Sequence, residues 1–191
     1  MPSAKDIFVK CDELESLPEP NRRNYLFELE RLGQILPKDS RVLQVGSMDG
    51  LRVIKLLQVR PDLTLTGLDI EPELVDLARR NVADANLAAT FVLGDITAPP
   101  AMPQFDWVIC LNHTLGYIPD QDKAVHEMRR LGRHVAISVF GEKFNKQLAR
   151  DYFSAIGLDD YGSVKRYTRR DIGAWGGQIT ETPIGYFVVA P

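Results

Sequence analysis

The sequence predicts a doubly wound α/β fold: a seven-stranded, mostly parallel sheet with helices on both faces and an antiparallel hairpin at its C-terminal end. Strand-like apolar runs alternate with segments of helical spacing between residues 41 and 156, which favours a parallel sheet. The run 107–111 is apolar throughout, as is typical of a strand buried on both faces. The last two runs, 178–182 and 186–190, are separated by three residues, and so short a connection permits antiparallel pairing alone.

The first predicted helix follows Pro20 and ends before Pro37. Apolar residues recur in it at helical spacing: Tyr25, Leu26, Leu29, Leu32, Ile35 and Leu36. Charged residues lie between them: Arg22, Arg23, Glu28 and Arg31.

The elements that follow begin and end at recognisable signals, such as Pro72 at a helix start and Gly132 at a helix end. Five further strands are predicted in order along the chain: 41–45, 63–68, 90–93, 105–111 and 134–140. The helices between and after them are predicted at 51–57, 72–82, 119–131 and 144–156. Thr168 and Asp171 are spaced as a capping box, which predicts one more short helix before the terminal hairpin.

Composition and charge bound the class of protein. The chain has 191 residues, of which 45% are hydrophobic and 26% charged, and we divide it into an N-terminal extension, 1–20, and a single domain, 21–191. The net charge is -3, without the basic footprint of a nucleic-acid-binding protein, so no nucleic-acid partner is expected. One basic cluster is interpreted as a solvated face: Lys165, Arg166, Arg169 and Arg170.

Targeting and redox signals are weak. No apolar run approaches the ~20 residues of a membrane span, so no membrane association is expected. Cys11 and Cys110 lie in such different contexts that they do not indicate a disulfide framework. We therefore expect a cytoplasmic protein without a metal site, and leave its oligomeric state open.

The turn after the first strand is the first candidate for a binding site. Two glycines, Gly46 and Gly50, let a ligand approach the backbone, and the helix start that follows offers free N–H groups. Tight turns without a ligand also contain two glycines. Asp69 strengthens the functional interpretation, because an acid about twenty residues further, at the end of the second strand, accepts hydrogen bonds from ribose hydroxyls in doubly wound folds. Capping of the helix at Pro72 is a compatible second role for Asp69.

The glycine spacing argues against one class of enzyme. A dinucleotide-binding turn has the pattern G-x-G-x-x-G, whereas Met48 stands two residues after Gly46 and the second glycine is Gly50. A nucleotide- or dinucleotide-binding oxidoreductase is therefore the disfavoured alternative.

Four segments in order resemble the class I S-adenosylmethionine-dependent methyltransferase family: 42–50, 67–70, 94–96 and 105–109, the last leading to Asn112. The resemblance extends from about Asn21 to the C-terminus. It implies a Rossmann-like fold whose last strand is antiparallel, S-adenosylmethionine as cofactor, and methyl transfer as the activity. A related aminopropyl transferase is the less favoured enzyme, because those enzymes usually carry an additional N-terminal β-domain.

The resemblance also implies roles for individual residues. The cofactor would be bound by residues of all four segments: Gln44, Gly46, Ser47, Gly50, Asp69, Ile70, Asp95, Ile96 and Asn112. Asp69 would hold the ribose hydroxyls, and Asp95 would accept a hydrogen bond from the exocyclic amino group of the adenine. Ile70 and Ile96 would flank the adenine ring. Asn112 would lie close to the reactive methyl group.

Two positions depart from the family pattern. Gln44 stands where the family commonly has an acid that anchors the cofactor's amino group, and glutamine accepts a hydrogen bond without charge assistance. Met48 stands where the family commonly has glycine. Both departures leave open the alternative of a noncatalytic protein of the same fold, or a partner subunit.

His113 is the candidate general base, because histidine titrates near neutrality and this one follows the fourth strand. A loop histidine that only hydrogen-bonds a backbone carbonyl is the competing interpretation. Tyr25 and Tyr117 are the candidate substrate-pocket residues. The segment 112–115 lacks the two prolines of relatives that methylate amino groups of bases or glutamine, so a small-molecule acceptor is expected.

Overall fold

The computed structural model of the protein describes residues 14–156 and 164–191. One sheet contains all of the described strands: β1 (Arg41–Val45), β2 (Thr64–Asp69), β3 (Thr90–Leu93), β4 (Phe105–Cys110), β5 (Gly132–Phe140), β6 (Gln178–Glu181) and β7 (Gly185–Ala190). The helices are α2 (Glu19–Ile35), α3 (Leu51–Val59), α4 (Pro72–Asp84), α5 (Gln121–Leu131), α6 (Lys146–Ala155) and α7 (Arg169–Gly173), with short 3-10 helices η2 (Leu14–Ser16) and η3 (Thr114–Tyr117).

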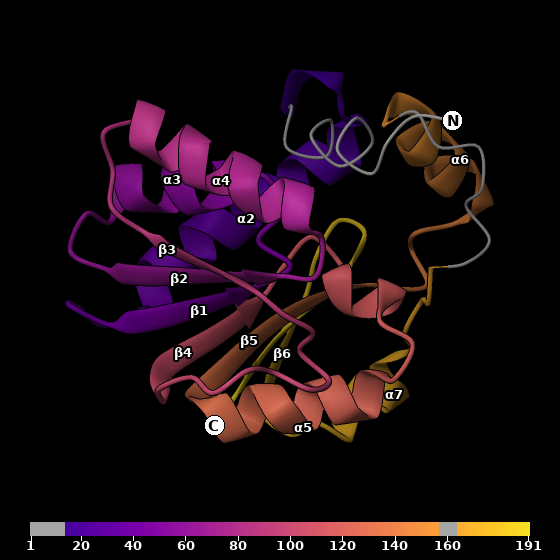
Figure 1. The fold of residues 1–191 in the computed structure, drawn as a ribbon. Helices are drawn as coiled ribbons and strands as arrows, with labels where there is room; N and C mark the ends of the chain where they lie inside the picture. The colour runs from indigo at the N-terminus through magenta and orange to yellow at the C-terminus, as the bar shows by residue number, and fades with distance from the viewer. Residues whose placement is uncertain (1–13, 157–163) are drawn as a thin grey trace.

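The sheet topology confirms the predicted fold class. The strand order is β3-β2-β1-β4-β5-β7-β6, with β1 to β5 parallel and β7 antiparallel to both β5 and β6. Figure 1 shows α2, α3 and α4 on one face of the sheet and α5 and α7 on the other. The predicted capping box is present, since Thr168 and Asp171 cap each other at the start of α7. The chain reverses direction along the sheet between β1 and β4, which is the switch point where doubly wound folds bind ligands.

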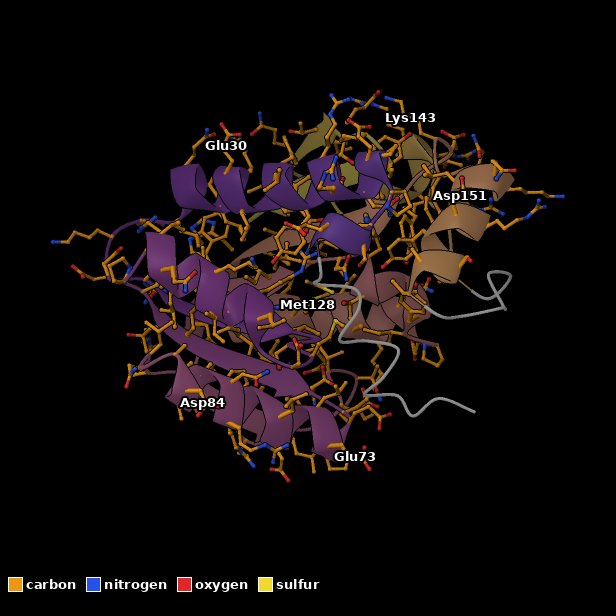
Figure 2. The ribbon with its side chains drawn as sticks, turned by 90° about the horizontal axis from the view of Figure 1, so that it is seen from above. Glu30, Glu73, Asp84, Met128, Lys143 and Asp151 are labelled. Atoms are coloured by element: carbon orange, nitrogen blue, oxygen red, sulfur yellow. The ribbon has the colours of Figure 1, made fainter. Side chains whose placement is uncertain are left out.

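The two faces of the sheet bury separate apolar clusters. Along β1, Val42 packs with the α2, α3 and α4 face, whereas Leu43 and Val45 pack with the α5 face. This alternation follows from the two-residue period of a strand. Seen from above in Figure 2, Met128 of α5 lies inside the molecule, while Glu30 and Asp84 lie at its rim. Both faces are therefore covered, as the continuous apolar strands predict.

Helix α2 buries Tyr25 and Leu32 of the predicted apolar face, but the buried face also includes polar residues that the apolar spacing does not indicate. Leu26 is 51% exposed, whereas Asn24 and Glu28 are buried together with Tyr25 and Leu32. The buried stripe follows helical spacing but includes polar and charged side chains, which must find partners in the fold. The helix begins at Glu19, two residues before the predicted domain start, and residues 1–13 of the predicted extension lie outside the described residues.

Helix α6 stands beyond the carboxyl end of the sheet (Figure 1) and carries a third apolar cluster. Within it, Phe140 at the end of β5 stacks on Phe144 with ring centroids 3.7 Å apart, and Tyr152 packs edge-on against both rings. In the described part of the chain, no helix is both long and apolar enough to cross a membrane.

Candidate active site

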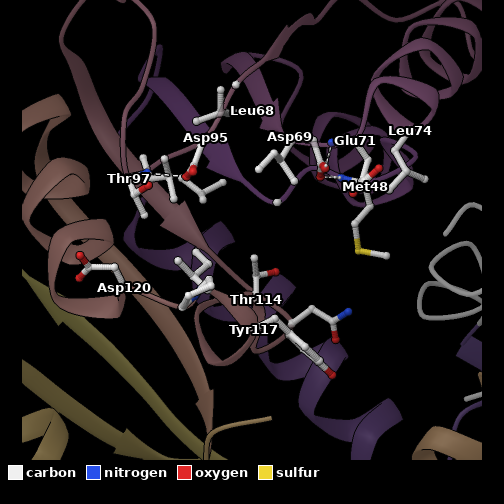
Figure 3. Close-up of a pocket in the computed structure, with 18 of the residues that line it drawn as sticks. Met48, Leu68, Asp69, Glu71, Leu74, Asp95, Thr97, Thr114, Tyr117 and Asp120 are labelled. Atoms are coloured by element: carbon white, nitrogen blue, oxygen red, sulfur yellow. Dashed lines mark hydrogen bonds between the residues drawn. The ribbon is translucent and has the colours of Figure 1, made fainter. Parts of the chain in front are cut away.

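A cavity of about 500 Å³ opens at the carboxyl ends of β1, β2, β3 and β4. Residues at the ends of these strands or just after them line it, among them Gly46 and Asn112, together with Asp69 and Asp95, which are labelled in Figure 3. The volume falls in the range of small-molecule sites, roughly 300–1,000 Å³. The cavity therefore occupies the place that the topology of the sheet predicts for a ligand.

The turn after β1 forms one wall and requires glycine at its first position. Gly46 has φ 68°, and its N–H donates to the carbonyl of Leu68 at 2.8 Å. A Cβ at Gly46 would lie 2.5 Å from Cγ2 of Thr114, which is closer than any real contact. The left-handed conformation and the close approach of Thr114 therefore both exclude a larger residue. Gly50, with φ 78°, then leads into α3.

Asp69 at the end of β2 is held by backbone donors. Its Oδ2 accepts the N–H of Met48 at 2.8 Å, and its Oδ1 accepts the N–H of Glu71 at 3.1 Å. Burial raises the pKa of Asp69 above its ordinary value, and the two N–H donors act in the opposite direction. A carboxylate has about four lone-pair sites, so the side chain that faces the cavity can accept further hydrogen bonds from a ligand.

The far end of the cavity is built by the segment after β3. Asp95 accepts the N–H of Thr97 at 2.8 Å, which fixes its carboxylate at the wall (Figure 3). Ile96 is buried beside it, whereas Ile70 is 60% exposed at the rim. This end thus combines one hydrogen-bond acceptor with two apolar side chains, a set suited to a flat heterocycle with an amino group.

The end of β4 turns sharply, because Asn112 and His113 both adopt the left-handed conformation, with φ 50° and 61°. Asn112 lines the cavity, but His113 is directed into the core, where its ring stacks on Phe140 at 3.7 Å. Its Nε2 lies 3.5 Å from Nδ2 of Asn24. Burial, and then the nearby charge of Arg52, lower the pKa of His113 to about 3. The ring is therefore neutral at physiological pH.

Most predicted site residues are brought together by the cavity. Seven line it: Gly46, Asp69, Ile70, Asp95, Ile96, Asn112 and Tyr117. Five do not line it: Gln44, Ser47, Gly50, Tyr25 and His113.

Packing accounts for three of the residues that lie elsewhere. Gln44 is buried two residues after Val42, on the face of β1 that packs against α2 and α3. Ser47 fills the space that a Cβ of Gly67 would occupy. The ring of Tyr25 lies under the guanidinium of Arg52, 3.9 Å from its centroid.

Several lining residues lay outside the predictions. Tyr152 and Ile156 approach from α6 and the residue after it, and Thr114 approaches from η3. The i, i+4 spacing of Tyr152 and Ile156 marks a helix face, but nothing in the local sequence indicates that this face borders a cavity. Asp120 caps α5 by accepting the N–H of Lys123 and lines the cavity as well.

Known proteins match the part of the chain that carries most of this cavity. Residues 42–134 match the family model described as a methyltransferase domain, which spans β1 to the start of β5. Carboxy-S-adenosyl-L-methionine synthase of Campylobacter concisus is 27% identical over 146 residues, covering 74% of this chain and 61% of that protein. Malonyl-[acyl-carrier protein] O-methyltransferase of Nitrosospira multiformis is 28% identical over 164 residues, covering 76% and 52%. The chain thus spans about three fifths or less of the length of these relatives.

Solved structures share the fold. A methyltransferase from Aquifex aeolicus that depends on S-adenosylmethionine superposes with a TM-score of 0.68 at 19% identity, covering 94% of this chain and 97% of that one. An amino pentose methyltransferase from Micromonospora echinaspora with S-adenosylmethionine bound superposes with a TM-score of 0.51 at 20% identity, covering 61% and 49%. Motifs, topology and family match agree: residues 42–134 form a methyltransferase domain, and the chain is similar to the class I S-adenosylmethionine-dependent methyltransferases.

Proposed function

We propose that the protein binds S-adenosylmethionine in the cavity at the ends of β1 to β4 and transfers its methyl group to a small-molecule acceptor. The observation that supports this most is the placement of Asp69, buried beside the Gly46 turn with acceptor sites directed at the cavity. A ribose with two neighbouring hydroxyls is the ligand group that such a carboxylate takes.

The other residues fit the rest of the cofactor. The carboxylate of Asp95 would accept a hydrogen bond from the exocyclic amino group of the adenine, whose ring would lie between Ile70 and Ile96. The backbone at Gly46 would pass under the ribose and methionine parts of the cofactor. Ser47 and Gly50 would contribute through the shape of the turn. The side chain of Gln44 lies on the face of β1 that packs against α2 and α3, so Gln44 would support the turn without contacting the cofactor.

The bound cofactor would supply a methyl group on a sulfonium: the acceptor atom would bond to the methyl carbon, the electron pair of the carbon–sulfur bond would stay on sulfur, and any proton on the acceptor atom would pass to water. The protein's task is then to hold the acceptor in line and exclude water, which supplies roughly 7–11 kcal/mol in favourable cases. Asn112 is placed to orient the acceptor from the end of β4. We assign His113 to positioning this turn, because its ring faces the core and binds protons weakly.

The acceptor has to be inferred from the cavity of this chain. The relatives' names include a glutamine of release factors, magnesium-protoporphyrin and malonyl-[acyl-carrier protein], so the shared domain serves unlike acceptors. The cavity of about 500 Å³ lies within the range of small-molecule sites, roughly 300–1,000 Å³. A small molecule is the acceptor class that this volume favours.

Calorimetric titration with S-adenosylmethionine, S-adenosylhomocysteine and NAD tests the proposal. We expect micromolar binding of the first two ligands by the wild type. Asp69→Ala is expected to weaken binding at least ~100-fold, because two hydrogen bonds to a charged group contribute roughly 1.5–3 kcal/mol each. Asp76→Ala in α4, a carboxyl that is exposed and outside the cavity, is the matched control and should bind as the wild type does. Absence of binding by the wild type at millimolar ligand would contradict the proposal and favour a noncatalytic protein of this fold.

The affinity for S-adenosylmethionine is also expected to depend on pH through Asp69. The ionised carboxylate accepts the ribose hydroxyls, and the protonated form loses these bonds. Because burial raises the pKa of Asp69 in the free protein, the affinity should start to fall at a higher pH than an ordinary aspartate would cause. Titrations from pH 7.5 downward measure this, and Asp69→Ala should flatten the dependence. A wild-type affinity that stays constant down to pH 4 would contradict this role.

A further inference from the structure

We propose that Met48 forms the wall of the acceptor site and limits the acceptor to a small, flat molecule without a negative charge. The inference rests on the proposed function, since it assigns the part of the same cavity that the cofactor leaves free.

Met48 has an unusual backbone. Its φ of 50° is left-handed, a conformation that costs a residue with a Cβ roughly 1–2 kcal/mol and costs glycine almost nothing. The N–H of Met48 donates to Asp69, so the conformation is fixed by the binding turn itself. A strained residue at a ligand site indicates that its side chain serves a purpose there, because glycine would satisfy the backbone alone.

The side chain of Met48 bridges the turn and helix α6. It packs in the same apolar cluster as Tyr152 and Ile156, and these three residues all line the cavity. In Figure 3 the thioether of Met48 points away from Asp69 and Glu71, toward the side of the cavity on which Tyr117 lies. Met48 thus closes the cavity on the side opposite to Asp95.

The two ends of the cavity differ in chemistry. Asp69 and Asp95 mark the ribose and adenine end, and the methionine part would lie over the Gly46 turn, so we assign the acceptor to the space among Met48, Tyr117 and Tyr152. Two aromatic rings and a polarisable thioether favour a flat apolar partner. Tyr117 is 41% exposed, which places this end next to solvent, where an acceptor can enter.

Charge excludes a further class of acceptor. Four carboxyl residues line the cavity: Asp69, Glu71, Asp95 and Asp120. Among the described lining residues there is no lysine, arginine or histidine to pair with an anionic acceptor. An acceptor that carries a carboxylate or phosphate would meet like charge without a counter-ion, which disfavours binding.

Methionine NMR tests this placement without requiring turnover. The full chain, labelled with ¹³C at its methionine methyls and saturated with S-adenosylhomocysteine, is titrated separately with catechol and with benzoate. Catechol should shift the Met48 methyl signal, which Met48→Leu identifies by its loss, while the Met102 and Met128 signals stay unchanged because these residues do not line the cavity. Benzoate should bind at least tenfold more weakly than catechol.

Size selection is tested with 2-naphthol. Met48→Ala is expected to bind it at least tenfold more tightly than the wild type, and Met48→Gly, which also relieves the left-handed backbone, should do the same. Met102→Ala is the matched control and should bind 2-naphthol as the wild type does. An unchanged affinity in both Met48 variants, a Met48 signal that ignores catechol, or equal binding of benzoate would overturn the proposal. If S-adenosylhomocysteine itself does not bind, the proposed function fails and this inference fails with it; if it binds, those outcomes overturn this inference alone.

Discussion

Replacing Glu28 by leucine is expected to lower the free energy of unfolding by about 3–5 kcal/mol, because it removes the buried carboxylate that pairs with the guanidinium of Arg52. Glu28 and Arg52 form an ion pair at 2.5 Å, with side chains 0% and 4% exposed. Asn24 donates to the other carboxylate oxygen at 2.8 Å. The loss of Glu28 therefore removes the acceptor from two buried donors at once.

Urea denaturation measures this effect, with the slope m monitored to exclude a change in the unfolded state. The double variant Glu28→Leu/Arg52→Met is expected to be considerably more stable than either single variant, because burying two apolar side chains leaves no charge uncompensated. Asp76→Asn removes the exposed pair with Arg79 and should cost less than about 1 kcal/mol. A Glu28→Leu variant as stable as Asp76→Asn would show that the buried pair contributes nothing.

This ion pair shows where the sequence stops predicting the fold. The periodicity of strands and helices, the turn signals and the short final connection were sufficient for all described strands and for the order of parallel and antiparallel pairs. The polar part of the buried face of α2 was not predictable from its apolar residues. Asn24 and Glu28 are buried because the fold brings Arg52 to Glu28 from the start of α3. The sequence of helix α2 alone does not indicate this contact.

The candidate site divides in the same way. Gly46, Asp69, Asp95 and Asn112 lie at strand ends, and a parallel sheet gathers its carboxyl ends at one edge, so their neighbourhood followed from order along the chain. The directions in which these side chains point did not follow from order along the chain. Two successive left-handed residues at the end of β4 direct Asn112 to the cavity and its neighbour His113 to the core, which sequence position alone does not distinguish.

Acidification should destabilise the protein through His113. Its pKa is about 3 in the folded protein, against 6.5 for an ordinary histidine, so below pH 6.5 the unfolded chain takes up a proton that the folded protein does not. The free energy of unfolding should therefore decrease as pH falls from about 6.5, by up to ~1.4 kcal/mol per pH unit, which amounts to about 2 kcal/mol at pH 5. The contribution is fully present above pH 6.5, because His113 is then neutral in both states.

The variant His113→Asn isolates this contribution, since asparagine tolerates the left-handed backbone at this position and does not titrate. Urea denaturation at pH 7.5 and at pH 5 should show a smaller loss of stability for His113→Asn than for the wild type, by about 2 kcal/mol. His126→Asn, at an exposed position of α5, is the control and should keep the wild-type dependence. Equal pH dependence in wild type and His113→Asn would mean that His113 protonates in the folded state, and would restore it as a candidate general base.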